Sequence, residues 1–257
     1  MFDRLLIMGI LNVTPDSFYD GGKWFRDPVG HAAAMIQDGA DIIDIGGESS
    51  GPDSQDVALE EELRRVVPVV SAIRKKYPNI LISVDTYKSE VARQALLAGA
   101  NMINDVTALR GDPKMADTVT RAGAWLIMMY SKDPSARTTR DVVHFDDVVA
   151  TIKDFFRQRD FAYDKIILDP GMGFFVSGEP KYSFEILDRL EEFRSLGRPI
   201  MLGPSNKSFL GGSLKDRLQG TIDCCAKAVM KGVNILRVHD VKAVRQSLSA
   251  RSQRPTN

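Results

Sequence analysis

The sequence predicts an α/β protein folded as one barrel of eight parallel strands, each followed by a helix: a (β/α)8 or TIM barrel. Its 257 residues are close to the usual length of one such barrel. Short apolar runs without alternation, typical of strands buried on both faces, recur between longer helical segments. Eight such units follow one another, and none is long enough to need a second domain. An open doubly wound sheet is the alternative, but no Gly-x-Gly-x-x-Gly turn follows the first strand.

The first four units combine apolar runs with recognisable helix signals. The second helix has a strongly periodic apolar side, although Pro68 should kink it or start a second segment. Ser89 is a suitable N-cap for the third helix. The expected strands are residues 5–11, 41–46, 80–86 and 102–106, and the expected helices are residues 29–40, 58–76, 89–99 and 113–122.

The last four units continue without a linker or low-complexity segment. We expect the barrel to occupy residues 1–250, with a polar, frayed tail at residues 251–257. Long βα loops are expected after the first and second strands, over residues 14–22 and 48–53. The remaining strands are expected at residues 125–130, 165–169, 199–203 and 234–240, and the remaining helices at residues 145–159, 182–195, 214–231 and 241–249.

Composition favours a cytoplasmic protein that binds neither nucleic acid nor membranes. Lys plus Arg and Asp plus Glu both number 34, so the net charge gives no sign of a broad basic surface. No apolar run reaches the length of a membrane span, and the first strand begins too early to leave room for a signal peptide. Cys224 and Cys225 are neighbours in a predicted helix, which favours buried free thiols over a disulfide or a zinc site.

Polar side chains follow almost every predicted strand. In a barrel the carboxyl ends of all strands open on one face, so these residues share one mouth. Each alone would be explained as a cap or a loop anchor, but together they indicate a pocket with carboxylates and amides in its floor. Arg237 lies between Leu236 and Val238 in a buried strand, so it must be paired or face the mouth, and His239 should point the same way. The strand-end residues are Asn12, Asp44, Glu48, Asp85, Asn104, Asp105, Met128, Asp169, Lys207, Arg237 and His239.

Such a pocket suits a ligand that carries adjacent N–H donors and a phosphate group. A carboxylate accepts two hydrogen bonds side by side, which matches the guanidine-like edge of an aminopyrimidinone ring. The plane of Arg237 could stack on that ring. Asn12, His239 and Lys207 could contact phosphate oxygens directly or through Mg²⁺, an ion that leaves little trace in sequence spacing.

The chain resembles the dihydropteroate synthases, enzymes of folate biosynthesis. The matching segments run in family order from Ile7 to Val241, and the first and last of them are highly specific together. They are residues 8–18 (Met-Gly-Ile-Leu-Asn-Val-Thr-Pro-Asp-Ser-Phe) with the Asp-Gly-Gly at 20–22, and residues 41–49, 83–86, 103–105, 168–174, 205–209 and 235–241.

The resemblance implies a transferase that joins 7,8-dihydropterin-6-ylmethyl diphosphate to 4-aminobenzoate and releases diphosphate. It implies an SN1-like course through a pterin carbocation, for which no nucleophile–base pair is needed. By this resemblance Asp85, Asn104, Asp169 and Lys207 hold the pterin, and Arg237 stacks on it. Asn12, Arg237 and His239 receive the diphosphate, and Asn12 also meets the Mg²⁺ ion. The catalytic set is Asn12, Asp85, Asp169, Lys207, Arg237 and His239, and the 4-aminobenzoate contacts are Thr14, Pro15, Phe18, Ser50, Lys207 and Ser208.

Three departures from the family pattern concern the aminobenzoate side. The second loop usually reads Gly-Glu-Ser-Thr-Arg-Pro-Gly, and here Gly51 stands in place of the arginine. In the seventh loop Ser-Arg-Lys-Ser has become Ser-Asn-Lys-Ser, with Asn206 at the variable position, and Tyr130 replaces a frequent histidine. One alternative is therefore a pterin-binding paralogue with lost or altered aminobenzoate use, and a less favoured one is the pterin-binding domain of a methyltransferase. The resemblance also implies a homodimer and sulfonamide binding.

Overall fold

The computed structural model describes residues 2–14, 27–159, 162–213 and 216–252. In this part of the chain eight parallel strands lie in the order β6-β5-β4-β3-β2-β1-β8-β7. An isolated parallel bridge between Leu168 and Ile200 joins the two ends of the sheet and closes the barrel, which confirms the predicted fold. The strands are β1 Leu6–Asn12, β2 Ile42–Gly46, β3 Leu81–Asp85, β4 Met102–Asp105, β5 Trp125–Met129, β6 Ile166–Asp169, β7 Met201–Leu202 and β8 Ile235–Val238.

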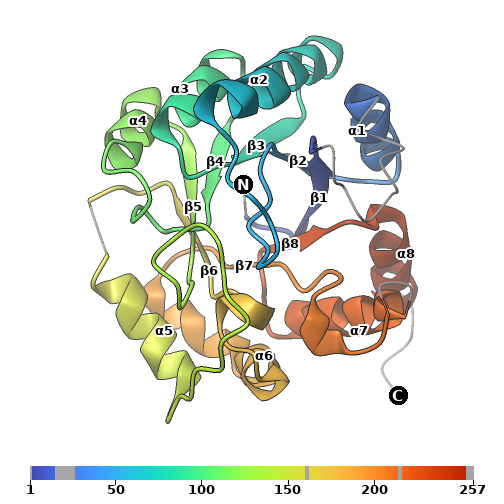
Figure 1. Ribbon diagram of the computed structural model, residues 1–257. Helices are drawn as coiled ribbons and strands as arrows, with labels where there is room; N and C mark the ends of the chain where they lie inside the picture. Colours follow the sequence, from blue (N-terminus) through green and yellow to red (C-terminus); the bar gives the residue numbers. More distant parts are fainter. Residues whose placement is uncertain (1, 15–26, 160–161, 214–215, 253–257) are drawn as a thin grey trace.

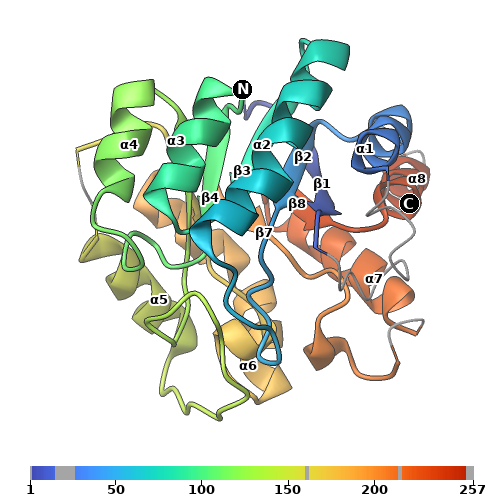
Figure 2. The ribbon, with the colours of Figure 1, turned by 45° about the horizontal axis from the view of Figure 1, so that its top comes forward.

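Helices surround the barrel (Figure 1). Figure 2 shows three of them, α2 to α4, side by side along one flank. None of the helices in the described ranges is long and apolar enough to cross a membrane. The α-helices are α1 Pro28–Gln37, α2 Leu59–Lys76, α3 Ser89–Leu97, α4 Met115–Ala122, α5 Val148–Arg157, α6 Pro180–Asp188, α7 Arg217–Met230 and α8 Val241–Ser252, and the 3-10 helices are η1 Gly173–Phe175, η2 Leu190–Leu196 and η3 Ser208–Leu210.

Strand residues alternate between the barrel interior and the helix layer, because successive side chains of a strand point to opposite faces. Ile7, Ile43 and Ile82 are fully buried in the large cluster that also contains helix residues such as Val66. Their alternation partners fill the lower part of the barrel and form a separate apolar cluster. It consists of Leu6, Met8, Ile42, Met102, Ile127, Ile167, Met201 and Ile235.

Several helix ends differ from the sequence prediction. Helix α2 runs without interruption through Pro68, so the proline starts no second segment. Ser89 is the first residue of α3 and makes no cap; instead its N–H donates to the Asp112 carboxylate at 2.9 Å from the next βα loop. The sixth helix divides into α6 and η2, and α8 extends to Ser252, three residues further than predicted.

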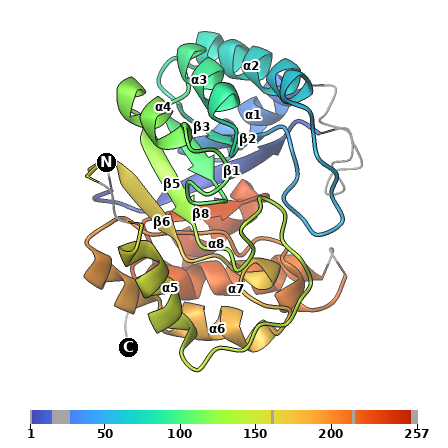
Figure 3. The same cartoon turned by 60° about the vertical axis from the view of Figure 1, so that its left-hand side comes forward.

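The longest βα connection follows β5, where the sequence predicts a polar loop over residues 131–140 and a helix from residue 145; the structure makes this connection longer. The Asp147 carboxylate accepts the Ala150 N–H at 2.8 Å and so starts α5 at Val148 rather than at Phe145. The resulting β5–α5 loop, residues 130–147, is longer than the β2–α2 loop, residues 47–58. Figure 3 shows the loops after β2 and β5 projecting from the same end of the barrel.

Candidate active site

The polar floor of the mouth lies one layer above the apolar cluster inside the barrel. Inward positions recur every second residue, so Ile42 is followed by Asp44 and Met102 by Asn104 on the same faces of their strands. In the same way Ile167 precedes Asp169. The strand register brings these side chains to similar heights, since Asp85 pairs with Gly46 on one side and with Asn104 on the other.

Arg237 is the centre of the floor and is held by two carboxylates. Its Nε donates to Asp44 at 2.6 Å, and its Nη2 donates to Asp85 at 2.7 Å. Asn104 donates its amide N–H to the same Asp44 oxygen at 3.2 Å. Burial lowers the pKa of Arg237, but the two carboxylates outweigh it and raise that pKa above the ordinary value. The guanidinium is therefore a permanent cation with a fixed plane.

Three buried polar atoms in this floor have no hydrogen-bond partner within the described ranges: Asp44 Oδ1, Asn104 Oδ1 and Ser83 Oγ. Unpartnered buried polar atoms are costly, and a bound ligand can supply the missing partners. Two of the three are acceptors, and the hydroxyl can either accept or donate. The floor is thus preorganised for a flat ligand with several N–H groups.

Asp169 and Lys207 are two further charges beside the floor, Asp169 buried and Lys207 half-buried, and they influence each other electrostatically. The Asp169 carboxylate accepts the Gly171 N–H at 2.8 Å, and burial raises its pKa to about 6. Burial also lowers the pKa of Lys207 to about 8, although Asp169 opposes this. The Lys207 ammonium lies 4.6 Å from the centre of the Phe175 ring, which belongs to a small apolar cluster with Val106 and Met129. Apolar and aromatic side chains therefore border this side of the floor.

Asp85 is the second carboxylate that pairs with Arg237, and its side chain is 16% exposed. Burial raises its pKa, and the neighbouring Asp44 adds to the rise while Arg237 opposes it. Three buried carboxylates, Asp44, Asp85 and Asp169, thus lie close to two cations. A ligand that donates hydrogen bonds or develops positive charge will be favoured here.

His239 follows β8 and lies at the phosphate side proposed from the sequence. Its Nδ1 lies 3.0 Å from Ser205 Oγ and 3.5 Å from Asn206 Nδ2. Burial, reinforced by Arg237, lowers the pKa of His239 to about 3, so the ring is neutral at physiological pH. Asn206 adopts a left-handed backbone with φ of 57°, a region that asparagine tolerates better than most residues.

Asn12 completes the mouth at the end of β1. It pairs in register with Gly46, which in turn pairs with Asp85. A Cβ atom on Gly46 would lie 3.6 Å from both Asn12 Oδ1 and Asp85 Cβ. The glycine therefore places no side chain beside the Asn12 amide oxygen, and such an oxygen suits a hard cation that brings most of its own oxygen ligands. In the described ranges no group of three or more His, Cys, Asp or Glu side chains is arranged around a metal.

Of the residues predicted to contact 4-aminobenzoate, only some lie in the described part of the chain. Pro15 and Phe18 lie outside the described residues, and Thr14 is the last residue before that gap. Ser208 begins η3, and the Ser50 carbonyl accepts the Thr138 N–H at 3.2 Å. Tyr130 packs its ring on Phe155 at 5.0 Å between the centroids, so it faces the helix layer.

Two strand-end residues named from the sequence have structural roles. Met128 belongs to the outer cluster between barrel and helices, whereas its neighbour Met129 faces the mouth. Asp105 accepts the N–H groups of Thr107 and Leu109, both at 2.8 Å, and so fixes the turn after β4.

The sequence prediction missed the roles of Asp44, Ser83 and Gly46. Asp44 was noted as a strand-end residue without a part in binding, yet it holds Arg237 and Asn104. The alternation of Ile42 with Asp44 and of Leu81 with Ser83 was a usable signal.

Comparisons with known proteins agree with this geometry. Residues 8–239 match the family described as "Pterin binding enzyme". The dihydropteroate synthase of Synechocystis sp. is 40% identical over 257 residues, covering 95% of this chain and 88% of that protein. The Xanthomonas albilineans dihydropteroate synthase, solved with 4-aminobenzoic acid, is 37% identical with a TM-score of 0.87, covering 99% of this chain and 95% of that one. The Yersinia pestis enzyme in a sulfonamide complex is 34% identical with a TM-score of 0.88, covering 98% and 96%.

The family match covers most of the chain, and the relatives share 34–40% of its residues together with the barrel fold. The chain belongs to the pterin-binding enzymes and, among them, to the dihydropteroate synthases of folate biosynthesis.

Proposed function

We propose that this chain joins 7,8-dihydropterin-6-ylmethyl diphosphate to 4-aminobenzoate, and that the residues of the barrel mouth carry the reaction. The observation that supports this most strongly is the row of buried atoms without partners, Asp44 Oδ1, Asn104 Oδ1 and Ser83 Oγ. An aminopyrimidinone ring presents the N–H groups that these atoms lack.

In this proposal the pterin lies flat on the floor. Asn104 and Asp169 accept hydrogen bonds from its N–H groups, and Lys207 donates to a ring acceptor. Asp44 and Asp85 fix the guanidinium of Arg237 through Nε and Nη2, and its plane stacks on the ring. Met129 and Phe175 supply the apolar wall.

The diphosphate is proposed to lie toward Asn12, Arg237 and His239. A Mg²⁺ ion would be held by Asn12 Oδ1 together with diphosphate oxygens and water, and would neutralise charge on the leaving group. Neutral His239 donates one N–H bond, and Arg237 with Lys207 adds positive charge near the departing oxygens.

The reaction proposed is SN1-like. The bond between the methylene carbon and the diphosphate oxygen breaks with its electron pair on oxygen, and the positive charge spreads into the pterin. The Asp85 and Asp169 carboxylates favour this charge across short distances in a dry pocket. The amine nitrogen of 4-aminobenzoate then bonds to the methylene carbon and loses a proton to water, which requires no strong protein base.

The second substrate is proposed to approach from the loops, with contacts to Thr14, Pro15, Phe18, Ser50, Lys207 and Ser208. The test is a steady-state assay of dihydropteroate formation from the two substrates with Mg²⁺. Absence of product, with pterin binding retained in calorimetry, would favour the pterin-binding paralogue instead.

Altered aminobenzoate recognition is tested by Gly51→Arg. Among the described residues, a Cβ atom on Gly51 would meet only Ser49 Oγ, at an ordinary contact distance of 3.5 Å. A fall in the KM for 4-aminobenzoate in this variant would assign the change to the β2–α2 loop, and an unchanged KM would exclude it.

We further propose a cytoplasmic homodimer that binds sulfonamides at the aminobenzoate site. Cys224 and Cys225 are free thiols, which supports the cytoplasmic location. The sulfonamide complex of the Yersinia pestis enzyme supports the last point. Analytical ultracentrifugation and competition by a sulfonamide against 4-aminobenzoate test these proposals.

A further inference from the structure

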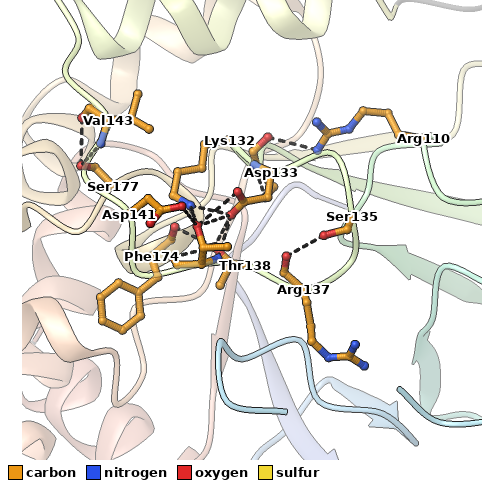
Figure 4. A network of polar contacts seen from close by, with 12 residues as sticks. Arg110, Lys132, Asp133, Ser135, Arg137, Thr138, Asp141, Val143, Phe174 and Ser177 are labelled. Carbon is orange, nitrogen blue, oxygen red and sulfur yellow. Dashed lines mark hydrogen bonds and ion pairs between the residues drawn. The ribbon is translucent and has the colours of Figure 1, made fainter. Parts of the chain in front are cut away.

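The β5–α5 loop is firmly attached to the segment that follows β6. The Lys132 N–H donates to the Phe175 carbonyl at 2.8 Å, and the Thr138 hydroxyl donates to the Phe174 carbonyl at 2.7 Å. Within the loop the Asp133 carboxylate accepts the Thr139 N–H at 2.9 Å (Figure 4). These bonds attach the loop on its β6 side, and its Ala136 packs against the apolar cluster of Val106, Met129 and Phe175.

The opposite edge of the same loop carries Arg137, whose guanidinium contacts three residues of the β2–α2 loop. Its Nε donates to Ser54 Oγ at 3.0 Å, its Nη2 donates to Glu48 at 2.7 Å, and its Nη1 donates to Asp56. The neighbouring Thr138 N–H adds a bond of 3.2 Å to the Ser50 carbonyl. Figure 4 shows Arg137 extending from its loop toward the ribbon of residues 47–58.

Arg137 continues a chain of charges that reaches the interior. Glu48, whose side chain is 8% exposed, also accepts from Lys88 at 2.5 Å. Lys88 donates at 2.5 Å to Glu62, which is 1% exposed, and at 2.7 Å to the Val57 carbonyl. Because Glu48 is buried, its charge needs both cations, and removal of Arg137 would leave it with one.

The β2–α2 loop cannot supply such a cation itself. Residues 47–58 read Gly-Glu-Ser-Ser-Gly-Pro-Asp-Ser-Gln-Asp-Val-Ala, with three carboxylates and neither lysine nor arginine. The cations that contact the loop come from other elements: Lys88, Arg65 of α2, and Arg137 and Arg140 of the β5–α5 loop. The conformation of the β2–α2 loop therefore depends on its neighbours.

We propose that Arg137 is a positioning residue that holds the β2–α2 loop, and with it Ser50, over the mouth, and so sets the affinity for 4-aminobenzoate. This inference rests on the proposed function of the site. Nε, Nη1 and Nη2 of Arg137 each donate a hydrogen bond to the β2–α2 loop, so we assign its effect to the loop and not to a contact with the substrate. Pterin binding depends on the strand-borne floor and should be independent of it.

The test compares Arg137→Met with Arg137→Lys and with the matched control Arg121→Met. Arg121 pairs with Asp117 on the outside of α4, and both side chains are exposed. In Arg137→Met we expect the KM for 4-aminobenzoate to rise about tenfold, with the KM for the pterin diphosphate and kcat changed less than about twofold. Arg137→Lys should recover part of the loss, since an ammonium can still reach one carboxylate. The control should match the wild type.

Hydrogen exchange of residues 47–58 gives a readout that does not depend on activity. Exchange in the unliganded protein should be about tenfold faster in Arg137→Met than in the wild type and in Arg121→Met. If Arg137→Met unfolds, Asp56→Asn is the second variant. It removes only the exposed carboxylate that pairs with Arg137 and should raise the KM for 4-aminobenzoate about twofold.

The possible outcomes distinguish a failure of the Arg137 proposal from a failure of the proposed function. An active wild type with an unchanged aminobenzoate KM in Arg137→Met overturns the inference and leaves the proposed function intact. A wild type that forms no dihydropteroate overturns the proposed function, and faster exchange in Arg137→Met would then support Arg137 as the loop anchor alone. Equal exchange rates in all variants would overturn the anchor as well.

Discussion

The floor of the mouth and the rim formed by the β2–α2 and β5–α5 loops are both held by ion pairs, but in different surroundings. In the floor Arg237 meets Asp44 and Asp85, whose side chains are 0% and 16% exposed and stand on strands. In the rim Arg140 meets Asp53, with 58% and 77% of the two side chains exposed. Arg137 is intermediate, because it joins buried Glu48 to exposed Asp56.

This difference suggests that the two substrate-binding sides of the barrel differ in how strongly they depend on single ion pairs. The Arg237 charge cannot be removed without leaving the Asp44 and Asp85 carboxylates uncompensated. An exposed ion pair between loops contributes little to the free energy of unfolding, so its loss should have a small effect. The pterin side should therefore respond steeply to mutation and the aminobenzoate side gradually.

The largest effect is expected from Arg237→Met. Its loss leaves the carboxylates of Asp44 and Asp85 buried without a cation, which should lower the free energy of unfolding by about 3–5 kcal/mol. Activity should fall at least about a thousandfold, because the stacking plane and a cation at the diphosphate are both lost. Urea unfolding and the dihydropteroate assay measure the two quantities. Arg245→Met is the control. Arg245 lies on α8, in the same βα unit as Arg237, and pairs with Asp41; its side chain is 31% exposed. Near-normal activity in Arg237→Met would refute the central role of the floor.

Asp169→Asn should weaken pterin binding about a hundredfold and yet stabilise the protein. The folded state raises the pKa of Asp169 to about 6 from an ordinary 3.8. Ionisation of this carboxyl therefore destabilises the native state as pH rises from about 4 to about 6, and that penalty persists at pH 7. Removing the charge should raise the free energy of unfolding at pH 7 by on the order of 2 kcal/mol. Asp164→Asn, a fully exposed change in the same unit, should alter neither quantity.

The pH profile of kcat/KM for the pterin diphosphate should be a narrow bell. Activity rises as Asp169 loses its proton near pH 6 and as Asp85, whose pKa is also raised by burial, loses its own, because a protonated carboxyl is a poorer acceptor and no longer favours the carbocation. Activity falls as Lys207 loses its proton near pH 8, because the departing diphosphate then lacks a cation. Lys207→Arg should move the alkaline limb beyond pH 10 or so, since arginine keeps its proton there. An alkaline limb that stays in place would assign it to another group.

How far the sequence predicts this molecule depends on whether a contact is local. Strand alternation gives Asp85, Asn104, Asp169 and Arg237 as inward residues, and the shared mouth follows from the barrel. The sequence shows that Arg237 needs a partner but not which one, because Asp44 and Asp85 are 193 and 152 residues away. The cap of α3 from Asp112 and the anchor at Arg137 are likewise contacts between loops, and no periodicity in the sequence marks them.

The smallest effect is expected from Arg140→Ala, which removes the exposed pair with Asp53 and the contact of Arg140 with the Phe174 ring at 5.2 Å. Solvent screens this pair, so the free energy of unfolding should fall by less than about 0.5 kcal/mol, and the aminobenzoate KM should stay within about twofold. A double-mutant cycle with Asp53→Asn, measured at low and high salt, gives the coupling directly. If Arg140→Ala instead raised the aminobenzoate KM as much as Arg137→Met, solvent exposure would not determine how much each ion pair of the rim contributes. The two loops would then act as one cooperative unit, in which any lost contact releases the whole edge of the mouth.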